Sequence, residues 1–241
     1  MLKTEIFSCF NKKLEKYWKD TKLHYSGHFF QSYIWLKHWY YCVGINQNIK
    51  ISIVVGFDNR KTCFILPLCI KKINNISVLT FLGGDQTDYN GFIYNQDFNL
   101  NNKYFSLKEI LNKKEFPNFD VIHFINVVKS DVQQEFYRDY RTNLKPQYIS
   151  NSINLPAKWD DFKSQVGRSL LSNTKRKINK LKKTGNLKLE IIDYNIISQS
   201  ELKNIFLSLF KDKGKRLTNT GNKNIFLNQD LKKFYMDMPF K

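Results

Sequence analysis

A run of cations in the second half of the chain has the clearest potential for chemistry. Seven Lys and Arg side chains occur from Arg168 to Lys183, and no acidic residue lies among them. Leu171, Ile178 and Leu181 recur in this segment at helical spacing, so one side of a helix can pack while its cations face water. Such a cationic face can bind phosphates, an acidic polysaccharide or an anionic membrane surface. A solvated helix in a Lys-rich chain would look the same, and the sequence leaves both interpretations open.

A glycine-containing turn is the second candidate site. Residues 82–91 read LGGDQTDYNG and follow a short apolar run that is typical of a strand. Glycines at such a position let the backbone approach a ligand, and Asp85 and Asp88 would add carboxylates there. A plain turn that leads into a strand at 91–94 would have the same composition. The turn is therefore a hypothesis for a binding site, with a structural turn as its alternative.

Histidine and cysteine spacing gives no pattern typical of a catalytic or metal site. His24 and His28 are four positions apart, but Gly27 lies between them and disfavours the helix that would align both imidazoles. His38 and His123 fall in aromatic or apolar segments, where a hydrogen-bonded core histidine is the commoner structure. The four cysteines show no CxxC spacing, so we expect reduced thiols and no bound metal.

The composition describes a folded and basic protein. The chain has 241 residues, of which 42% are hydrophobic and 15% aromatic, and this is enough for a core and argues against disorder. Lys and Arg number 39 against 21 acidic residues, which gives a net charge of +18. Only six of these cations are Arg, the residue that binds phosphate in a bidentate manner. We therefore do not expect nucleic acid to be the partner.

Two absences from the sequence narrow the class of protein. No window approaches ~18 uncharged apolar residues, and the N-terminal segment lacks an apolar stretch and a small-residue cleavage site. We therefore expect no transmembrane segment and a cytoplasmic location. The ten glycines form neither GxGxxG nor a P-loop, which argues against enzymes that bind nucleotide phosphates through glycine loops.

Hydrophobic periodicity predicts helices that alternate with strands, as in an α/β (α+β) protein. Ser32 is placed to cap one helix, while Gly44 and Gly185 are placed to end two of them. The composition becomes more basic after residue 155, which predicts a domain boundary there. The predicted helices cover 2–20, 31–43, 131–142, 159–183, 198–211 and 225–238, with a loop at 214–223. The predicted strands cover 49–57, 62–70, 77–82, 119–127, 150–155 and 188–193, the first two joined as a hairpin.

Four stretches, taken in order, carry a resemblance to a known family. They are FQSYIWL at 30–36, FLGGDQTDY at 81–89, the run from Leu155 to Gly185, and LFKDKGKRL at 209–217. The matching residues of the third stretch are Leu155, Pro156, Trp159, Arg168, Ser169, Asn173, Arg176, Lys180, Leu181 and Gly185. The first three stretches resemble the motifs FQSxxWL, FLG…DY and LP…W…SR…NxRRKxRRLxxxG of the CelD-type, FemAB-like branch of the GNAT acyltransferase superfamily. The fourth is similar to a short cationic stretch of that branch.

The resemblance implies two GNAT-like modules in tandem, built on a mixed sheet flanked by helices. Residues 1–155 would form the N-terminal module, and residues 156–241 would contain a basic connecting helix and the start of a second, incomplete module. It also implies acyl transfer from acyl-CoA or acetyl-CoA to an amine or hydroxyl of an envelope polysaccharide or a related surface-polymer precursor. The superfamily's (Q/R)xxGx(G/A) pyrophosphate loop does not occur, so we expect a chain truncated at its C-terminal side that can be inactive as a fragment.

Candidate site residues follow from the resemblance together with the charges. Asp88 is the candidate acid/base or acceptor-contacting carboxylate. Two alternatives stay open: a basic module that binds an anionic polymer or nucleic acid, and a non-catalytic scaffold completed by another chain. Steep salt dependence of binding would favour the first alternative over an acyl-CoA site. The candidate contacts to CoA phosphates or to an anionic acceptor are Lys175, Arg176, Lys177, Lys213 and Arg216.

Overall fold

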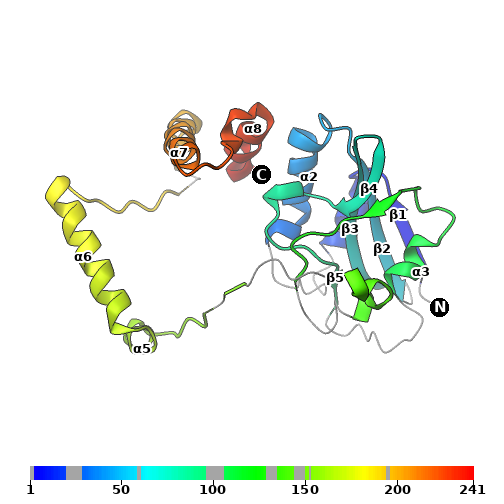
Figure 1. Ribbon diagram of the computed structural model, residues 1–241, viewed down its shortest axis with the longest axis horizontal. Coiled ribbons are helices and arrows are strands. Elements are labelled where there is room, and N and C mark those ends of the chain that lie inside the picture. Colours follow the sequence, from blue (N-terminus) through cyan, green and yellow to red (C-terminus); the bar gives the residue numbers. More distant parts are fainter. Residues whose placement is uncertain are drawn as a thin grey trace. The chain divides into compact units, whose positions relative to one another are not determined.

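Contacts between residues divide the chain into two compact units. The first contains residues 1–147 and 199–241, and the second contains residues 148–198. Figure 1 shows the sheet of the first unit and the helices of both, coloured along the chain from blue to red. The computed structural model describes residues 3–19, 29–58, 61–95, 106–128, 135–143, 150–151, 153–193 and 196–241.

A six-stranded mixed sheet forms the framework of the first unit. Its strands follow the order β1-β2-β3-β4-β6, and β5 pairs with β3 beside this path. The pairs β1–β2, β2–β3 and β3–β4 are antiparallel, whereas β4 and β6 are parallel. The fold is therefore mixed α/β, which confirms the predicted class at this level. The strands are β1 (Lys3–Phe7), β2 (Lys50–Asp58), β3 (Lys61–Ile73), β4 (Ile76–Phe81), β5 (Ile93–Tyr94) and β6 (Val121–Ile122).

Both faces of this sheet are covered by hydrophobic clusters. Successive side chains of the central strands point to opposite faces and belong to different clusters. In β2, Ile53 and Val55 belong to one hydrophobic cluster, whereas Val54 between them belongs to another. In β3, Ile65 belongs to the first cluster and Phe64 to the second. Strands that are buried on both faces have continuous apolar sequences. This is why the sequence predicts the central hairpin well.

Helices cover the two faces of the sheet. Side chains of α1, α2 and α8 belong to the first cluster, and side chains of α3 belong to the second. Helix α2 continues directly into a π-helical turn, η2. Helix α7 packs beside α8 (Figure 1). The described helices of this unit are α1 (Lys12–Trp18), η1 (Phe29–Gln31), α2 (Tyr33–Trp39), η2 (Tyr40–Gly44), η3 (Gly84–Gln86), α3 (Leu107–Leu111), η4 (Arg138–Asn143), α7 (Gln199–Asn219), η5 (Ile225–Leu227), α8 (Gln229–Asp237) and η6 (Met238–Phe240).

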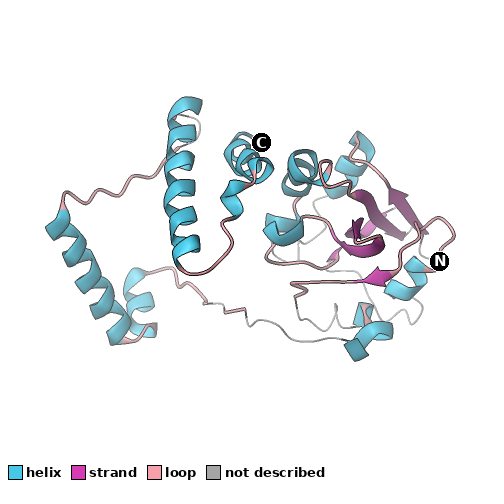
Figure 2. Cartoon of the chain, turned by 45° about the horizontal axis from the view of Figure 1, so that its top comes forward, coloured by secondary structure: helices cyan, strands magenta, loops and turns pink. Residues whose placement is uncertain are grey.

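The second unit contains two helices in its described residues, α5 (Trp159–Gln165) and α6 (Arg168–Thr184) (Figure 2). The sequence predicts one helix over 159–183, and the structure interrupts it. Val166 is extended, with φ of −89° and ψ of 141°, so the helical hydrogen-bond pattern stops there. Gly167 then precedes the first residue of α6, at a position where its poor helix propensity costs little.

Residues 2–20 are predicted as one helix but contain strand β1 followed by helix α1. Pairing with β2 supplies the hydrogen bonds of the strand. The side chain of Asn11 then accepts a hydrogen bond from the backbone N–H of Leu14 at 2.8 Å and begins the helix. Apolar residues that recur every four positions also fit a short strand and a short helix in succession. The prediction was wrong because this spacing was assigned to a single helix.

Three predicted strands are shorter than expected or absent. Within 119–127 only β6 is a strand, and Asn126 has a φ of 56°, which a strand does not allow. The described residues of 150–155 form no strand. Residues 188–193 also form none, and all their side chains are exposed. The runs at 150–155 and 188–193 are apolar enough for strands, but among the described residues no strand pairs with either of them.

Several other predicted elements are confirmed. The strand at 77–82 is β4, and Ser32 Oγ accepts a hydrogen bond from the backbone N–H of Trp35 at 3.2 Å, as expected for the cap of α2. Helix α6 ends where predicted. Helix α7 continues to Asn219, however, so the loop predicted from residue 214 begins too early. The predicted helix at 131–142 lies partly outside the described residues, and its described part ends in η4.

The contacts divide the chain differently from the boundary predicted at residue 155. The second unit spans residues 148–198, and the chain from residue 199 onward belongs to the first unit. Leu231 and Phe234 of α8 explain this, because both are buried in the first hydrophobic cluster. The assignment of residues 156–241 to a second module stays a prediction.

Candidate functional site

Three segments that are distant in the sequence meet on one side of the sheet: α2, the turn at residues 82–91, and α8. Trp39 of α2 donates a hydrogen bond from Nε1 to Oε1 of Gln86 in the turn at 3.0 Å. Trp35 of the same helix lies edge-to-face with Phe234 of α8, and their ring centroids are 4.8 Å apart. We call this region the turn site.

Two glycines allow the turn to approach α2 closely. Gly83 has a φ of 110° and Gly84 a φ of 56°, which are conformations that favour glycine. A Cβ atom at Gly83 would collide with Oγ1 of Thr87 and would lie 3.0 Å from Cδ2 of Leu36. A Cβ atom at Gly84 would lie 2.9 Å from the ring of Trp39. The two glycines thus bring the turn close to α2, as expected for the structural turn, whereas the approach to a ligand stays a prediction.

Two side-chain amides, one buried and one half-buried, hold the rest of the turn in place. Nε2 of Gln31, a residue that is 2% exposed, donates a hydrogen bond to the carbonyl oxygen of Gly91 at 2.6 Å. Nδ2 of Asn126 donates to the carbonyl oxygen of Thr87 at 3.0 Å. Since these bonds involve the middle and the end of the turn, the backbone between them has a defined position. That backbone carries Asp88.

The turn presents Asp88 to solvent in the neighbourhood of α8. Asp88 is exposed, whereas Tyr235 of α8 is half-buried. Burial raises the pKa of the Tyr235 phenol, and the negative charge of Asp88 raises that pKa further. The two groups therefore interact electrostatically. A carboxylate that accepts hydrogen bonds beside a neutral phenol that can donate one is suited to contact a polar acceptor molecule.

Two buried polar atoms near the turn site have no hydrogen-bond partner in the described part of the chain. They are Nε1 of Trp35 and Oγ1 of Thr87. Leaving such a group unsatisfied costs about 1–3 kcal/mol. Each atom could therefore gain a hydrogen bond from a bound water or from a polar group of a ligand.

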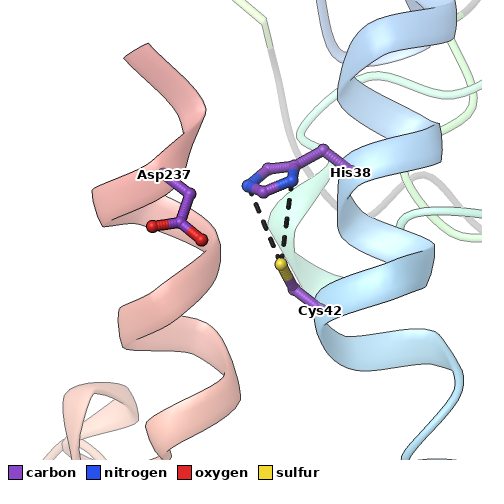
Figure 3. A group of neighbouring side chains, drawn as sticks. All are labelled: His38, Cys42 and Asp237. Atoms are coloured by element: carbon purple, nitrogen blue, oxygen red, sulfur yellow. Dashed lines mark hydrogen bonds between the residues drawn. The ribbon is translucent and has the colours of Figure 1, made fainter. Parts of the chain in front are cut away.

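A buried imidazole, a buried thiol and a half-buried carboxylate meet where α2 and η2 face α8 (Figure 3). His38 Nε2 lies 3.0 Å from the carbonyl oxygen of Phe234, so it carries the proton and donates it. Cys42 Sγ lies 3.7 Å from Nδ1 of the same ring. The ligand atoms of His38, Cys42 and Asp237 all lie within 4.8 Å of one another. This group was not predicted from the sequence, although His38 and Cys42 are four residues apart in a predicted helix and could have been paired on that ground.

The donor set of this group resembles that of a metal site, but its environment explains it without a metal. Burial lowers the pKa of His38 and raises the pKa of Cys42, so the imidazole is neutral and the thiol protonated near neutral pH. Nitrogen, sulfur and oxygen ligands are those that Zn²⁺ accepts. The positive charges of Lys233 and Lys241 and the negative charge of Asp237 all act on His38. The hydrogen bond from His38 to the carbonyl oxygen of Phe234 gives the group a structural role in fixing α2 against α8.

The five candidate CoA-contacting cations are divided between the two units. Lys175, Arg176 and Lys177 are exposed on α6 of the second unit. Lys213 and Arg216 are exposed on α7 of the first unit, and Lys213 Nζ lies 5.8 Å from the ring centroid of Phe226. The structure thus groups these residues as a set of three and a set of two. Their proposed role stays a prediction.

None of the helices in the described residues is both long and apolar enough to cross a membrane. Comparisons with known proteins add no further assignment. No protein-family model matches the chain, and no match was found among curated proteins or solved structures.

Proposed function

We propose that this chain acts in acyl-CoA-dependent N- or O-acyl transfer of the GNAT type, with an envelope polysaccharide or a related surface-polymer precursor as acceptor. The observation that carries the proposal is the turn site. Two of the four family-like stretches, 30–36 and 81–89, lie far apart in the sequence and yet contact each other there. The rings of Phe30 and Tyr89 lie 6.3 Å apart, and Leu36 packs against Gly83. A mixed sheet flanked by helices is also the architecture that the resemblance implies.

The proposed reaction is a direct transfer. The acceptor's amine or hydroxyl attacks the thioester carbonyl carbon and forms a C–N or C–O bond, while the C–S bond breaks. The sulfur leaves as a thiolate and is protonated to the thiol, and the acceptor loses one proton. Removal of that proton needs a base, and the developing oxyanion needs hydrogen-bond donors.

In the proposed reaction, Asp88 would serve the acceptor. Its carboxylate is exposed, and the turn that carries it is anchored to α2 by Gln86. It would accept the proton of the nucleophile or orient the acceptor by a hydrogen bond. The neutral phenol of Tyr235 would supply a hydrogen-bond donor beside it. The two sets of cations would attract the CoA phosphates or an anionic acceptor.

Release of free thiol from acetyl-CoA tests this assignment. The 241-residue chain would be mixed with acetyl-CoA and a panel of amino sugars and polysaccharide fragments. We expect thiol release that depends on the acceptor. Asp88→Asn should lower the rate by at least about 100-fold, because a positioned base contributes that much.

Asp85→Asn is the matched control, because Asp85 is exposed in the same turn. Its rate should stay within about twofold of the unchanged chain, since Asp88 and not Asp85 acts on the pKa of Tyr235. Equal losses in both variants would contradict the role given to Asp88. The absence of both thiol release and acetyl-CoA binding would contradict the proposed function itself.

A further inference from the structure

Helix α6 separates its charges from its apolar side chains. At 3.6 residues per turn, its apolar positions fall within a sector about 100° wide, and its cations lie outside that sector. We call this sector the apolar stripe. It contains Leu170, Leu171, Thr174, Ile178 and Leu181. The cations are Arg168, Lys175, Arg176, Lys177, Lys180, Lys182 and Lys183.

The described residues of the second unit leave the apolar stripe without a buried side chain. No residue of α6 is buried. Leu170 is 56% exposed, Ile178 40% and Leu181 53%. Single exposed leucines are normal on a protein surface, but a continuous stripe of them usually marks an interaction site.

Lysines border the apolar stripe on both sides. On the helical projection, Lys177 lies about 20° beyond one edge and Lys182 about 20° beyond the other. A lysine in such a position can lay its methylene groups along an apolar surface while its ammonium group reaches phosphates. A helix at a membrane surface has this arrangement, with apolar residues at the acyl boundary and cations at the level of the headgroups.

We propose that α6 binds the surface of a membrane that contains anionic lipids, with its apolar stripe toward the acyl chains. This inference does not depend on the proposed acyl transfer. It fits the observations better than binding to nucleic acid, because bases pack on aromatic side chains and α6 contains none. Only two of the seven cations are Arg, the residue favoured for bidentate phosphate binding. With 17 residues and seven charges, α6 would lie in the plane of the membrane.

Co-sedimentation of the full 241-residue chain with lipid vesicles tests the proposal. We expect binding to vesicles made of phosphatidylcholine and phosphatidylglycerol in equal parts. Binding to vesicles of phosphatidylcholine alone should be at least about tenfold weaker, because each cation near an anionic surface adds to the attraction. Equal binding to both kinds of vesicle, or binding to neither, would overturn the proposal.

Changes in the apolar stripe separate a membrane from a polyanion. Ile178→Asn combined with Leu181→Asn should weaken binding to the anionic vesicles by at least about tenfold, while binding to inorganic polyphosphate stays unchanged. Both side chains are exposed, and circular dichroism would verify that the variant keeps its helices. Leu207→Asn on α7 is the control, because Leu207 is 43% exposed and lies outside the stripe.

Two further outcomes would count against a membrane partner. The stripe variant could bind anionic vesicles as tightly as the unchanged chain, which would mean that the contact is purely electrostatic. The unchanged chain could also bind single-stranded DNA more tightly than it binds vesicles at the same salt concentration. Either result would overturn the proposal: the first would remove the role of the apolar stripe, and the second would assign the cations of α6 to a polyanion.

Discussion

Gly83 illustrates how a single residue positions the turn site. Its φ of 110° disfavours other residues, and the space for a Cβ atom is already filled by Thr87 and Leu36. The strained backbone conformation alone costs about 1–2 kcal/mol for a residue with a side chain. The collision adds to this cost, because both neighbours belong to a packed region.

We therefore expect Gly83→Ala to lower the free energy of unfolding by about 2–4 kcal/mol, as measured by urea denaturation. Gly221→Ala is the matched control, because Gly221 has a φ of 73° but has open space where its Cβ would lie. That variant should lose only about 1 kcal/mol. Equal losses at the two positions would show that contact between the turn and α2 contributes little.

His38 links stability to pH through its burial between α2 and α8. Burial lowers its pKa below the ordinary value of 6.5, so the unfolded chain takes up a proton at a higher pH than the folded chain. The free energy of unfolding contributed by this group is therefore present above about pH 6.5 and is lost as the pH falls toward the folded pKa.

Urea denaturation at about pH 7.5 and about pH 5.5 tests this link. The unchanged chain should be less stable at the lower pH, and His38→Gln should show a smaller difference between the two. His123→Gln serves as the control, because His123 is exposed, and it should keep the full difference. An unaltered pH dependence in His38→Gln would rule out His38 as the source.

At the scale of the elements, the start of α2 depends on one side-chain cap. Ser32 Oγ accepts a hydrogen bond from Trp35 at 3.2 Å and so satisfies one of the free N–H groups of the first turn. Ser32→Ala should lower the free energy of unfolding by about 1 kcal/mol, whereas Ser32→Asp should retain most of it. Thermal denaturation of the three proteins measures this. Equal stability of Ser32→Ala and the unchanged chain would contradict the role of the cap.

The sequence predicts elements well where local signals and burial agree. The hairpin of β2 and β3 is buried on both faces, so its apolar runs are unambiguous. Residues 2–20 are different, since their spacing suits two short elements as well as one helix. Residues 188–193 fail for another reason: a strand needs a neighbour to pair with, and no local property of the sequence supplies one.

The same distinction applies to the candidate site. The turn at 82–91 stands out in the sequence because of its glycines, and in the structure these glycines lie close to α2. The neighbours of the turn do not stand out. Gln31 and Tyr235 come from segments far away in the chain, and their proximity depends on how α2 and α8 pack on the sheet.

At the scale of the whole molecule, the two units divide the candidate functions. The first unit holds the turn site, with Asp88 and the cations of α7. The second holds α6, whose two faces suit an anionic membrane surface. The predicted boundary at residue 155 differs from this division because α8 returns to the first hydrophobic cluster. The change in composition after residue 155 does not reveal that α8 packs in the first unit, because this packing depends on contacts between residues that are far apart in the sequence.

The measurement that tests the account most directly is calorimetric binding of acetyl-CoA and of ATP to the 241-residue chain at one fixed salt concentration. An acyl-CoA site recognises more than phosphate charge, so acetyl-CoA should bind at least about tenfold more tightly, or about 1.4 kcal/mol. The preference should persist when the salt concentration is raised, because it does not arise from counterion release. Equal affinities that fall together with increasing salt would contradict acyl transfer and leave a basic polyanion-binding protein.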